Sequence, residues 1–200
     1  MPFYPKILSE LQSDGEFRKA APVFLNFPLD LPKKQIEHIV EYTKEITDEM
    51  NGYFNKTDFT DKGGVLLSVF GAPTASEHMI ENAIGLAEKI RERFPDVNIT
   101  AGIDYGITYA GFIGSPLWQE YTVLGDIVNT ASRLSVIGND EINISRNVKD
   151  QLNVYESSHI GNFKLKGKYS RCPVYKITSR KSHIFRFSSP FVGRDEETFI

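Results

Sequence analysis

Cysteine is nearly absent from this chain, because Cys172 is the only one among 200 residues. An intramolecular disulfide is therefore impossible, and this composition is typical of a reducing compartment. Long apolar runs are missing as well, since none approaches the roughly 18–20 residues that a membrane-spanning helix requires. The N-terminus also lacks the basic-then-apolar pattern of a secretory signal peptide. We therefore expect a cytoplasmic protein that does not enter a membrane.

Positive charge is not in excess either. The chain carries 23 Lys and Arg against 26 Asp and Glu, which gives a net charge of −3. Without a broad basic field, binding to nucleic acid is not expected. Neither a Gly-x-x-x-x-Gly-Lys-(Ser/Thr) phosphate loop nor a nucleophile motif occurs. What is present is 40% hydrophobic residues, enough for a buried core in one domain with short appendages.

The spacing of apolar residues predicts a mixture of strands and helices. Strands are expected at 22–27, 53–59, 65–70, 142–144 and 173–177, and residues 97–113 alternate as two strands with a turn near 105–106. Helices are expected at 32–50 and 76–94, from Asp126 onward, and from near Ser145. This order fits an α+β, ferredoxin-like βαββαβ core, an antiparallel sheet with helices packed on one face.

Residues 121–133 combine a short apolar strand with the start of a helix. Gly125 permits a sharp turn, and Asp126 is a natural N-cap for the helix. Asn129 and Arg133 are four residues apart, so they lie on the same helix face. The planar guanidinium suits phosphate oxygens, and an amide can bind a sugar or a phosphate. The alternative is a surface helix with a solvated Arg, which is common.

The same stretch, Tyr-Thr-Val-Leu-Gly-Asp-Ile-Val-Asn-Thr-Ala-Ser-Arg, closely resembles the signature of class III nucleotidyl cyclases, without gaps. The resemblance implies that Asn129 orients the ribose of the substrate. It implies that Arg133 stabilises charge on the transferring phosphoryl group. Residues 163–168, Phe-Lys-Leu-Lys-Gly-Lys, resemble a further family segment, in which Lys166 corresponds to the residue that reaches the triphosphate. The alternative for Lys166 is a solvent-facing basic hairpin.

Two positions that hold catalytic metals in active members of the family differ here. The first strand of the family carries Phe-x-Asp, whereas this chain has Phe-Leu-Asn and places Asn26 at the metal position. The second metal-binding Asp corresponds to Gly64. A neutral amide is a poor Mg²⁺ ligand compared with a carboxylate. Asp30 or Asp61 could substitute only from a different or shifted loop. We therefore expect Mg²⁺ or Mn²⁺ to be held by a partner domain and not by this chain alone.

In family members with two unlike cyclase domains, one half supplies the metal ligands and the other supplies the Asn, the Arg and a base-reading Lys. This chain resembles the second kind, particularly the second domain of soluble, bicarbonate-responsive adenylyl cyclases. Lys62 is the candidate for the purine ring, with Lys56 as the rival, and Thr122 corresponds to the second base-reading residue. Thr at that position is typical of adenylyl cyclases, so ATP is the expected substrate and cyclic AMP the product.

The resemblance also implies a domain organisation. Residues 1–19 are expected to form a lead-in helix or linker, residues 20–178 the cyclase homology domain, and residues 179–200 a linker. The tail resembles the opening of an ATPase module often joined to such domains. Residues 102–115 resemble a family hairpin that packs across the dimer interface, so a second cyclase domain is the expected partner. A catalytically inactive, regulatory homology domain is the second interpretation. A small binding module is the third, and it would not explain the signature.

Overall fold

The computed structural model describes residues 15–60, 63–115 and 117–181. Its helices are α2 (Lys33–Glu49), α3 (Met79–Arg93), α4 (Asp126–Leu134) and α5 (Arg146–Lys149). Its strands are β1 (Gly15–Phe27), β2 (Tyr53–Thr60), β3 (Gly63–Phe70), β4 (Thr100–Ile103), β5 (Gly106–Ser115), β6 (Trp118–Leu124), β7 (Ile142–Ser145), β8 (Tyr155–Phe163) and β9 (Cys172–Arg180). None of the described helices is long and apolar enough to cross a membrane.

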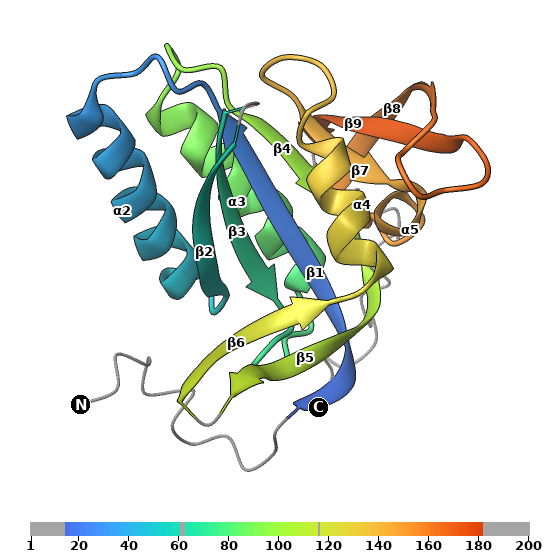
Figure 1. The fold of residues 1–200 in the computed structure, drawn as a ribbon. Helices are drawn as coiled ribbons and strands as arrows, with labels where there is room; N and C mark the ends of the chain where they lie inside the picture. The colour runs from blue at the N-terminus through green and yellow to red at the C-terminus, as the bar shows by residue number, and fades with distance from the viewer. Residues whose placement is uncertain (1–14, 61–62, 116, 182–200) are drawn as a thin grey trace, which may run out of the picture.

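The strands form one connected sheet with β1 near its centre (Figure 1). Its main order is β2-β3-β1-β4-β7-β9-β8, and β5 and β6 extend from β1 as a separate branch. Every strand pair in the described residues is antiparallel except β4 with β7. The expected α+β core with a largely antiparallel sheet is therefore confirmed.

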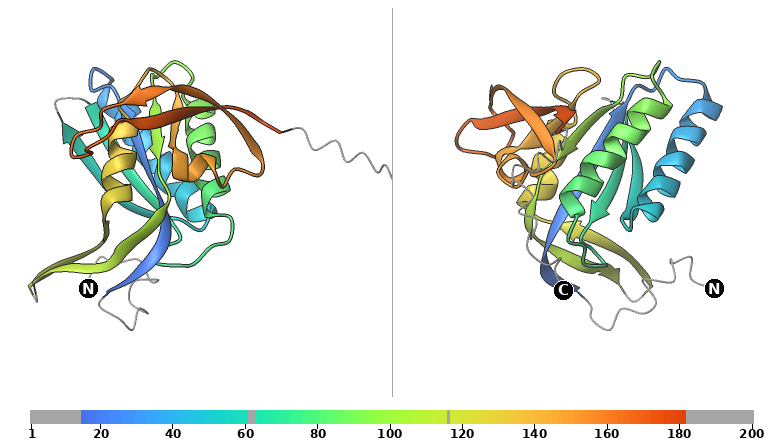
Figure 2. Two further views of the ribbon diagram at one scale, coloured as in Figure 1. Left: turned by 90° about the vertical axis from the view of Figure 1, so that its right-hand side faces the viewer. Right: turned by 180° about the vertical axis from the view of Figure 1, so that it is seen from behind.

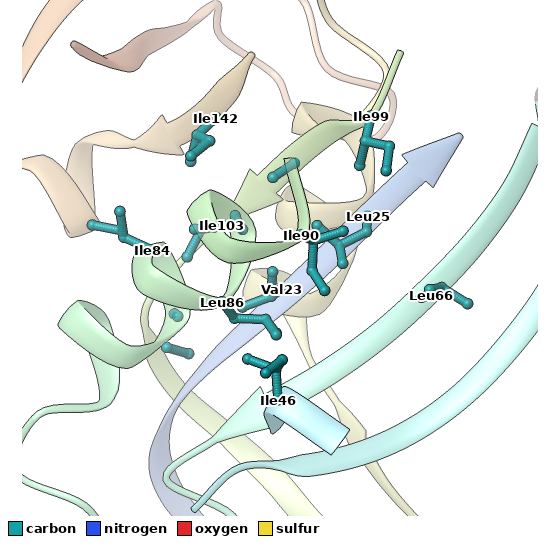
Figure 3. Packing of buried hydrophobic residues seen from close by; sticks show 14 of the residues in the cluster. Val23, Leu25, Ile46, Leu66, Ile84, Leu86, Ile90, Ile99, Ile103 and Ile142 are labelled. Carbon is teal, nitrogen blue, oxygen red and sulfur yellow. The ribbon is translucent and has the colours of Figure 1, made fainter. Parts of the chain in front are cut away.

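Side chains on the two faces of β1 belong to two separate hydrophobic clusters. Val23 and Leu25 point to one side, where they pack with Ile84, Leu86 and Ile90 of α3 (Figure 3). Phe24 points to the other side and packs in a second cluster with Ala131 of α4. Successive side chains of a strand point to opposite faces, so one strand can serve both clusters.

Helices cover both faces of the sheet, whereas the sequence pattern predicted helices on one face, because Ala131 in the apolar stripe of α4 packs in the second cluster. Figure 2 shows α2 and α3 together in front of the sheet when it is seen from behind, as expected for the two long helices. In Figure 1, α4 lies on the opposite face, near β1 and β4. This second face matters for function because α4 carries the signature residues.

The expected hairpin turn near residues 105–106, within the region 97–113, is wrong. Strands β4 and β5 do not pair with each other. They lie one after the other along β1, and each pairs with it. Ile103 lies opposite Val23 and Gly106 lies opposite Ala20, so the chain continues along β1 in one register with a short break. The 13-residue length of β1 provides room for both. The hairpin is formed instead by β5 and β6, which project from the body as an arm (Figure 2).

The ends of the domain also differ from expectation. Strand β1 begins at Gly15, inside the segment expected to be a lead-in helix or linker, because β5 pairs with residues 15–20. Strand β9 continues to Arg180. Residues 1–14 and 182–200, which include the tail that resembles an ATPase module, lie outside the described residues.

Candidate functional site

A cavity of about 350 Å³ opens between β2, β6 and α4. This volume is within the range of small-molecule sites. Its lining combines apolar and polar side chains: Phe24, Lys56, Asp58, Thr60, Val65, Leu67, Glu120, Thr122, Val123, Leu124, Val128, Asn129 and Ser132. Two of the expected site residues, Thr122 and Asn129, therefore lie in one cavity.

Strand β2 supplies the charged part of the lining. Lys56, Asp58 and Thr60 alternate along it, so their side chains share one face. Lys56 thus lies in the same cavity as Thr122, whereas Lys62 is outside the described residues. Lys56, Asp58 and Thr60 are exposed, but Thr122 is only 7% exposed at the inner wall.

Helix α4 carries the signature pair. Ile127, Ala131 and Leu134 are buried and hold the helix against the sheet. Asn129, on the outer side, lines the cavity. The helix begins at Asp126 as expected, but Asp126 is not its N-cap. Gly125 occupies that position, and the Asp126 carboxylate instead forms an ion pair with Lys168.

Arg133 and Lys166 are not among the described residues that line the cavity. The Arg133 Nη2 atom is 3.6 Å from the point that a Cβ on Gly167 would occupy, so the guanidinium faces the turn that contains Lys166. Gly167 has a φ of +80°, a left-handed conformation that favours glycine. The Lys168–Asp126 ion pair ties this turn to the start of α4. Neither Arg133 nor Lys166 forms an ion pair within the described part of the chain.

The position of α4 depends on Gly102 of β4. A Cβ added to Gly102 would lie 2.1 Å from the Ala131 carbonyl oxygen and 2.2 Å from the Ser135 amide nitrogen. These are backbone atoms, so no side-chain rotation can relieve the contact. Only glycine allows α4 to approach the sheet this closely.

We therefore expect Gly102→Ala to lower the free energy of unfolding by about 3 kcal/mol, the upper end of typical overpacking costs. Gly85→Ala is the matched control. A Cβ on Gly85 would meet the flexible terminal methyl of Met50 at 3.0 Å and the Tyr155 hydroxyl at 4.0 Å, and Ala is the better helix residue there. Denaturant titration of both variants checks the expectation. Equal effects in the two variants would mean that α4 can move away from β4 without cost.

The expected metal positions do not offer a metal site. The Asn26 Nδ2 atom is buried and has no hydrogen-bond partner among the described residues. A Cβ on Gly64 would lie 2.3 Å from Cζ of the fully buried Phe27 ring, so the ring covers the place of a second carboxylate. Asp30 is exposed, and Asp61 lies outside the described residues. Within the described ranges, no group of three or more His, Cys, Asp or Glu could hold a metal ion. These donors do not fit Mg²⁺ or Mn²⁺.

Sequence reasoning missed a buried carboxylate at the break between β4 and β5. Asp104 is 2% exposed and accepts hydrogen bonds from Ser145 Oγ, the Tyr105 amide and Asn147 Nδ2. Burial raises the pKa of the Asp104 carboxyl, and the three hydrogen bonds and the charge of Lys168 oppose that rise. Asp104 thereby fixes the end of β4 to the start of α5. An isolated Asp in a sequence gives no signal of this role.

Sequence reasoning also missed Asn55, whose side chain joins β2 to β6. Its Nδ2 atom donates to the Tyr121 carbonyl oxygen at 2.8 Å, and its Oδ1 atom accepts from Thr122 Oγ1 at 3.2 Å. The Tyr121 ring makes edge-to-face contacts with Tyr53 and Phe112. Burial raises the pKa of Tyr121 to about 12. This polar and aromatic cluster supports the inner wall of the cavity.

Residues 34–180 match the family model of the adenylate and guanylate cyclase catalytic domain. The match covers more than half of the chain, so the chain belongs to this family. It is a class III nucleotidyl cyclase domain, related to both adenylyl and guanylyl cyclases. The resemblance inferred from the signature is confirmed.

Individual relatives are distant. Adenylate cyclase type 10 of Oryctolagus cuniculus is 28% identical over 131 residues, which cover 60% of this chain and 8% of that protein. An uncharacterized protein of Mycobacterium tuberculosis H37Rv is 31% identical over 137 residues, which cover 62% of this chain and 25% of that protein. The chain thus corresponds to a small part of these curated relatives.

Solved structures share the fold. The guanylate cyclase domain of RhGC from Catenaria anguillulae, in complex with GTP, has a TM-score of 0.73 at 22% identity. That similarity covers 83% of this chain and all of the other. The adenylyl cyclase CyaB from P. aeruginosa has a TM-score of 0.74 at 18% identity, covering 84% of this chain and 98% of the other. One neighbour is a guanylyl and the other an adenylyl cyclase, so these likenesses leave the nucleotide to be decided from the cavity.

Proposed function

We propose that this domain is one half of a class III adenylyl cyclase and supplies the residues that bind the base, ribose and phosphates of ATP. The observation that carries the proposal is the cavity that contains Lys56, Thr122 and Asn129, next to Arg133 on the same helix as Asn129. The absence of a fitting metal site at Asn26 and Gly64 supports a half-site rather than a complete one.

The proposed reaction forms a bond between the ribose 3′ oxygen and the α-phosphorus of ATP and breaks the bond from that phosphorus to the bridging oxygen of pyrophosphate. The products are cyclic AMP, pyrophosphate and the proton that the 3′ hydroxyl releases. The Asn129 side chain, held on a rigid helix, would orient the ribose through hydrogen bonds. Arg133 would stabilise the charge that develops on the phosphoryl oxygens, since a preorganised cation is most effective where charge changes. Lys166 would bind the triphosphate as a compact charge.

The partner in this proposal is a second cyclase domain, in a hetero- or pseudo-heterodimer that one parent chain could contain. ATP would lie at the interface, and the partner would hold Mg²⁺ or Mn²⁺. Exposed apolar side chains on β1 and the β5–β6 arm support such an interface. Phe17, Ile107, Leu117 and Trp118 are 66–98% exposed. Burying such exposed apolar side chains against a partner would favour association.

A second candidate function is a catalytically inactive homology domain that regulates a partner through dimerisation. The observation that favours it is the pair Asn26 and Gly64, because the covering Phe27 ring fills the metal position at residue 64. One measurement distinguishes the two proposals. Mixing the chain with a cyclase domain that carries both metal carboxylates should create ATP cyclisation under the first proposal and none under the second.

The base pocket should prefer ATP to GTP by about ten- to a hundred-fold in affinity, from one or two mismatched hydrogen bonds. A lysine donates to adenine N1, whereas guanine N1 carries a hydrogen and cannot accept. Competition binding to the reconstituted pair measures the ratio. Lys56→Glu should reduce the preference if Lys56, which lines the cavity, reads the base. Lys62→Glu tests the other candidate, which lies outside the described residues.

Two carboxylates in the cavity could favour GTP instead, so the ratio of ATP to GTP affinity is a stringent test of the base pocket. Asp58 and Glu120 also line the cavity and are exposed. Carboxylates can accept from the N1–H and the 2-amino group of guanine. Equal affinity for ATP and GTP, or a preference for GTP, would mean that Asp58 and Glu120 read the base in place of Lys56.

A further inference from the structure

Asn55 is the extra residue of a β-bulge. The pairing of β2 with β3 shifts between Phe54, opposite Ser68, and Lys56, opposite Leu67. A bulge changes the direction of a side chain relative to regular alternation. Here the Asn55 side chain reaches across to β6, which pairs with β5 and not with β2.

The orientation of the Asn55 amide follows from its two partners. The Tyr121 carbonyl oxygen can only accept, so the group that faces it at 2.8 Å must be the NH₂. The amide oxygen therefore faces Thr122 Oγ1, at 3.2 Å. Because this oxygen also can only accept, the Thr122 hydroxyl must donate to it.

A threonine hydroxyl has a single hydrogen. Once that hydrogen is committed to Asn55, Thr122 presents only oxygen lone pairs to the cavity. Lone pairs accept from the 6-amino group of adenine. They face the 6-oxo group of guanine, which is also an acceptor, without any hydrogen between the two oxygens.

We propose that Asn55 is a positioning residue for base selection. It holds Thr122 as an obligate acceptor and so selects nucleotides of 6-aminopurines over those of 6-oxopurines. The inference rests on the proposed function, because it assumes that the cavity binds the base of a nucleotide. Asn55 acts through Thr122 and lies behind it, at the junction of β2 and β6.

The main test is the ratio of ATP to GTP affinity of the pair reconstituted with a metal-carrying cyclase domain. Asn55→Leu frees the Thr122 hydroxyl to rotate and donate to a 6-oxo group, so the ratio should fall about ten-fold, the effect of one matched hydrogen bond. With Thr122→Val already present, Asn55→Leu should not change the ratio further. Asn82→Leu is the matched control. It also removes an amide–carbonyl hydrogen bond, to Met50 at 3.0 Å, but on α3.

NMR of the chain by itself tests the hydrogen bond without any nucleotide. We expect a slowly exchanging hydroxyl proton on Thr122, lost in Asn55→Leu and kept in Asn82→Leu. Its absence from the unsubstituted chain would overturn the inference. An unchanged ATP-to-GTP ratio in Asn55→Leu would overturn the inference alone. A reconstituted pair that binds neither nucleotide would overturn the proposed function, and the inference with it.

Discussion

Arg133→Ala should reduce cyclic AMP formation by the reconstituted pair about 10²–10³-fold, the usual cost of removing one positioned group that stabilises transition-state charge. Arg133 forms no ion pair within the described residues, so its charge is available to a substrate. Its guanidinium already faces the turn of Lys166 and Gly167. The fall should appear mainly in kcat, because the interaction strengthens as the α-phosphate reacts.

Two further variants separate charge from structure. Arg133→Lys keeps the charge but loses the planar fork, so it should recover only part of the activity. Arg146→Ala is the control, since Arg146 is 70% exposed on α5 and its one ion pair among the described residues is with Asp150. It should leave activity within about two-fold, as for most surface substitutions. If Arg133→Ala also stayed within a few-fold of the parent pair, α4 would be a structural helix and the regulatory proposal would lead.

The chain without a partner should make no measurable cyclic nucleotide from ATP with Mg²⁺ or Mn²⁺, at least about a thousand-fold below the reconstituted pair. Metal ions contribute several kcal/mol of charge stabilisation in such reactions, and a pair of identical chains would place Asn26 and Gly64 at both sites. Asn26→Asp alone should not restore activity. The buried Phe27 ring still covers residue 64, where any Cβ would approach it to 2.3 Å.

The measurement is a cyclisation assay on the purified chain over a range of metal and protein concentrations, with the reconstituted pair as the positive control. Substantial metal-dependent turnover by the chain alone would contradict the alignment of the metal positions. Asp30→Asn and Asp61→Asn would then identify the carboxylate that binds the metal. Loss of turnover in one of them, with the fold intact, would assign it.

Much of this protein follows from local patterns in its sequence. The helices expected at 32–50 and 76–94 are α2 and α3, within a few residues at each end. The helix expected from Asp126 is α4. These features depend on periodicity within a few turns, so residues close in sequence are sufficient to specify them. The signature and the family are linear patterns of the same kind.

Other features depend on contacts between residues far apart in sequence. The bulge at Asn55 places Lys56 in the cavity and joins Asn55 to Thr122, 67 residues away. A shift of one residue reverses the face of every following side chain, and no local pattern reveals where such a shift occurs. The course of β4 and β5 along β1 was hidden for the same reason, because alternation does not identify the partner strand.

The sequence by itself determined the family, the α+β class and the pairing of Asn129 with Arg133 on one helix, since each is encoded over short distances. The tertiary structure alone decided three further points. It gave α4 the face of the sheet opposite α2 and α3, packed on Gly102. It brought the Phe27 ring over Gly64. It turned the Thr122 hydroxyl toward Asn55. Each is a steric or hydrogen-bonding relation set by sheet register, which forms only when distant strands pair.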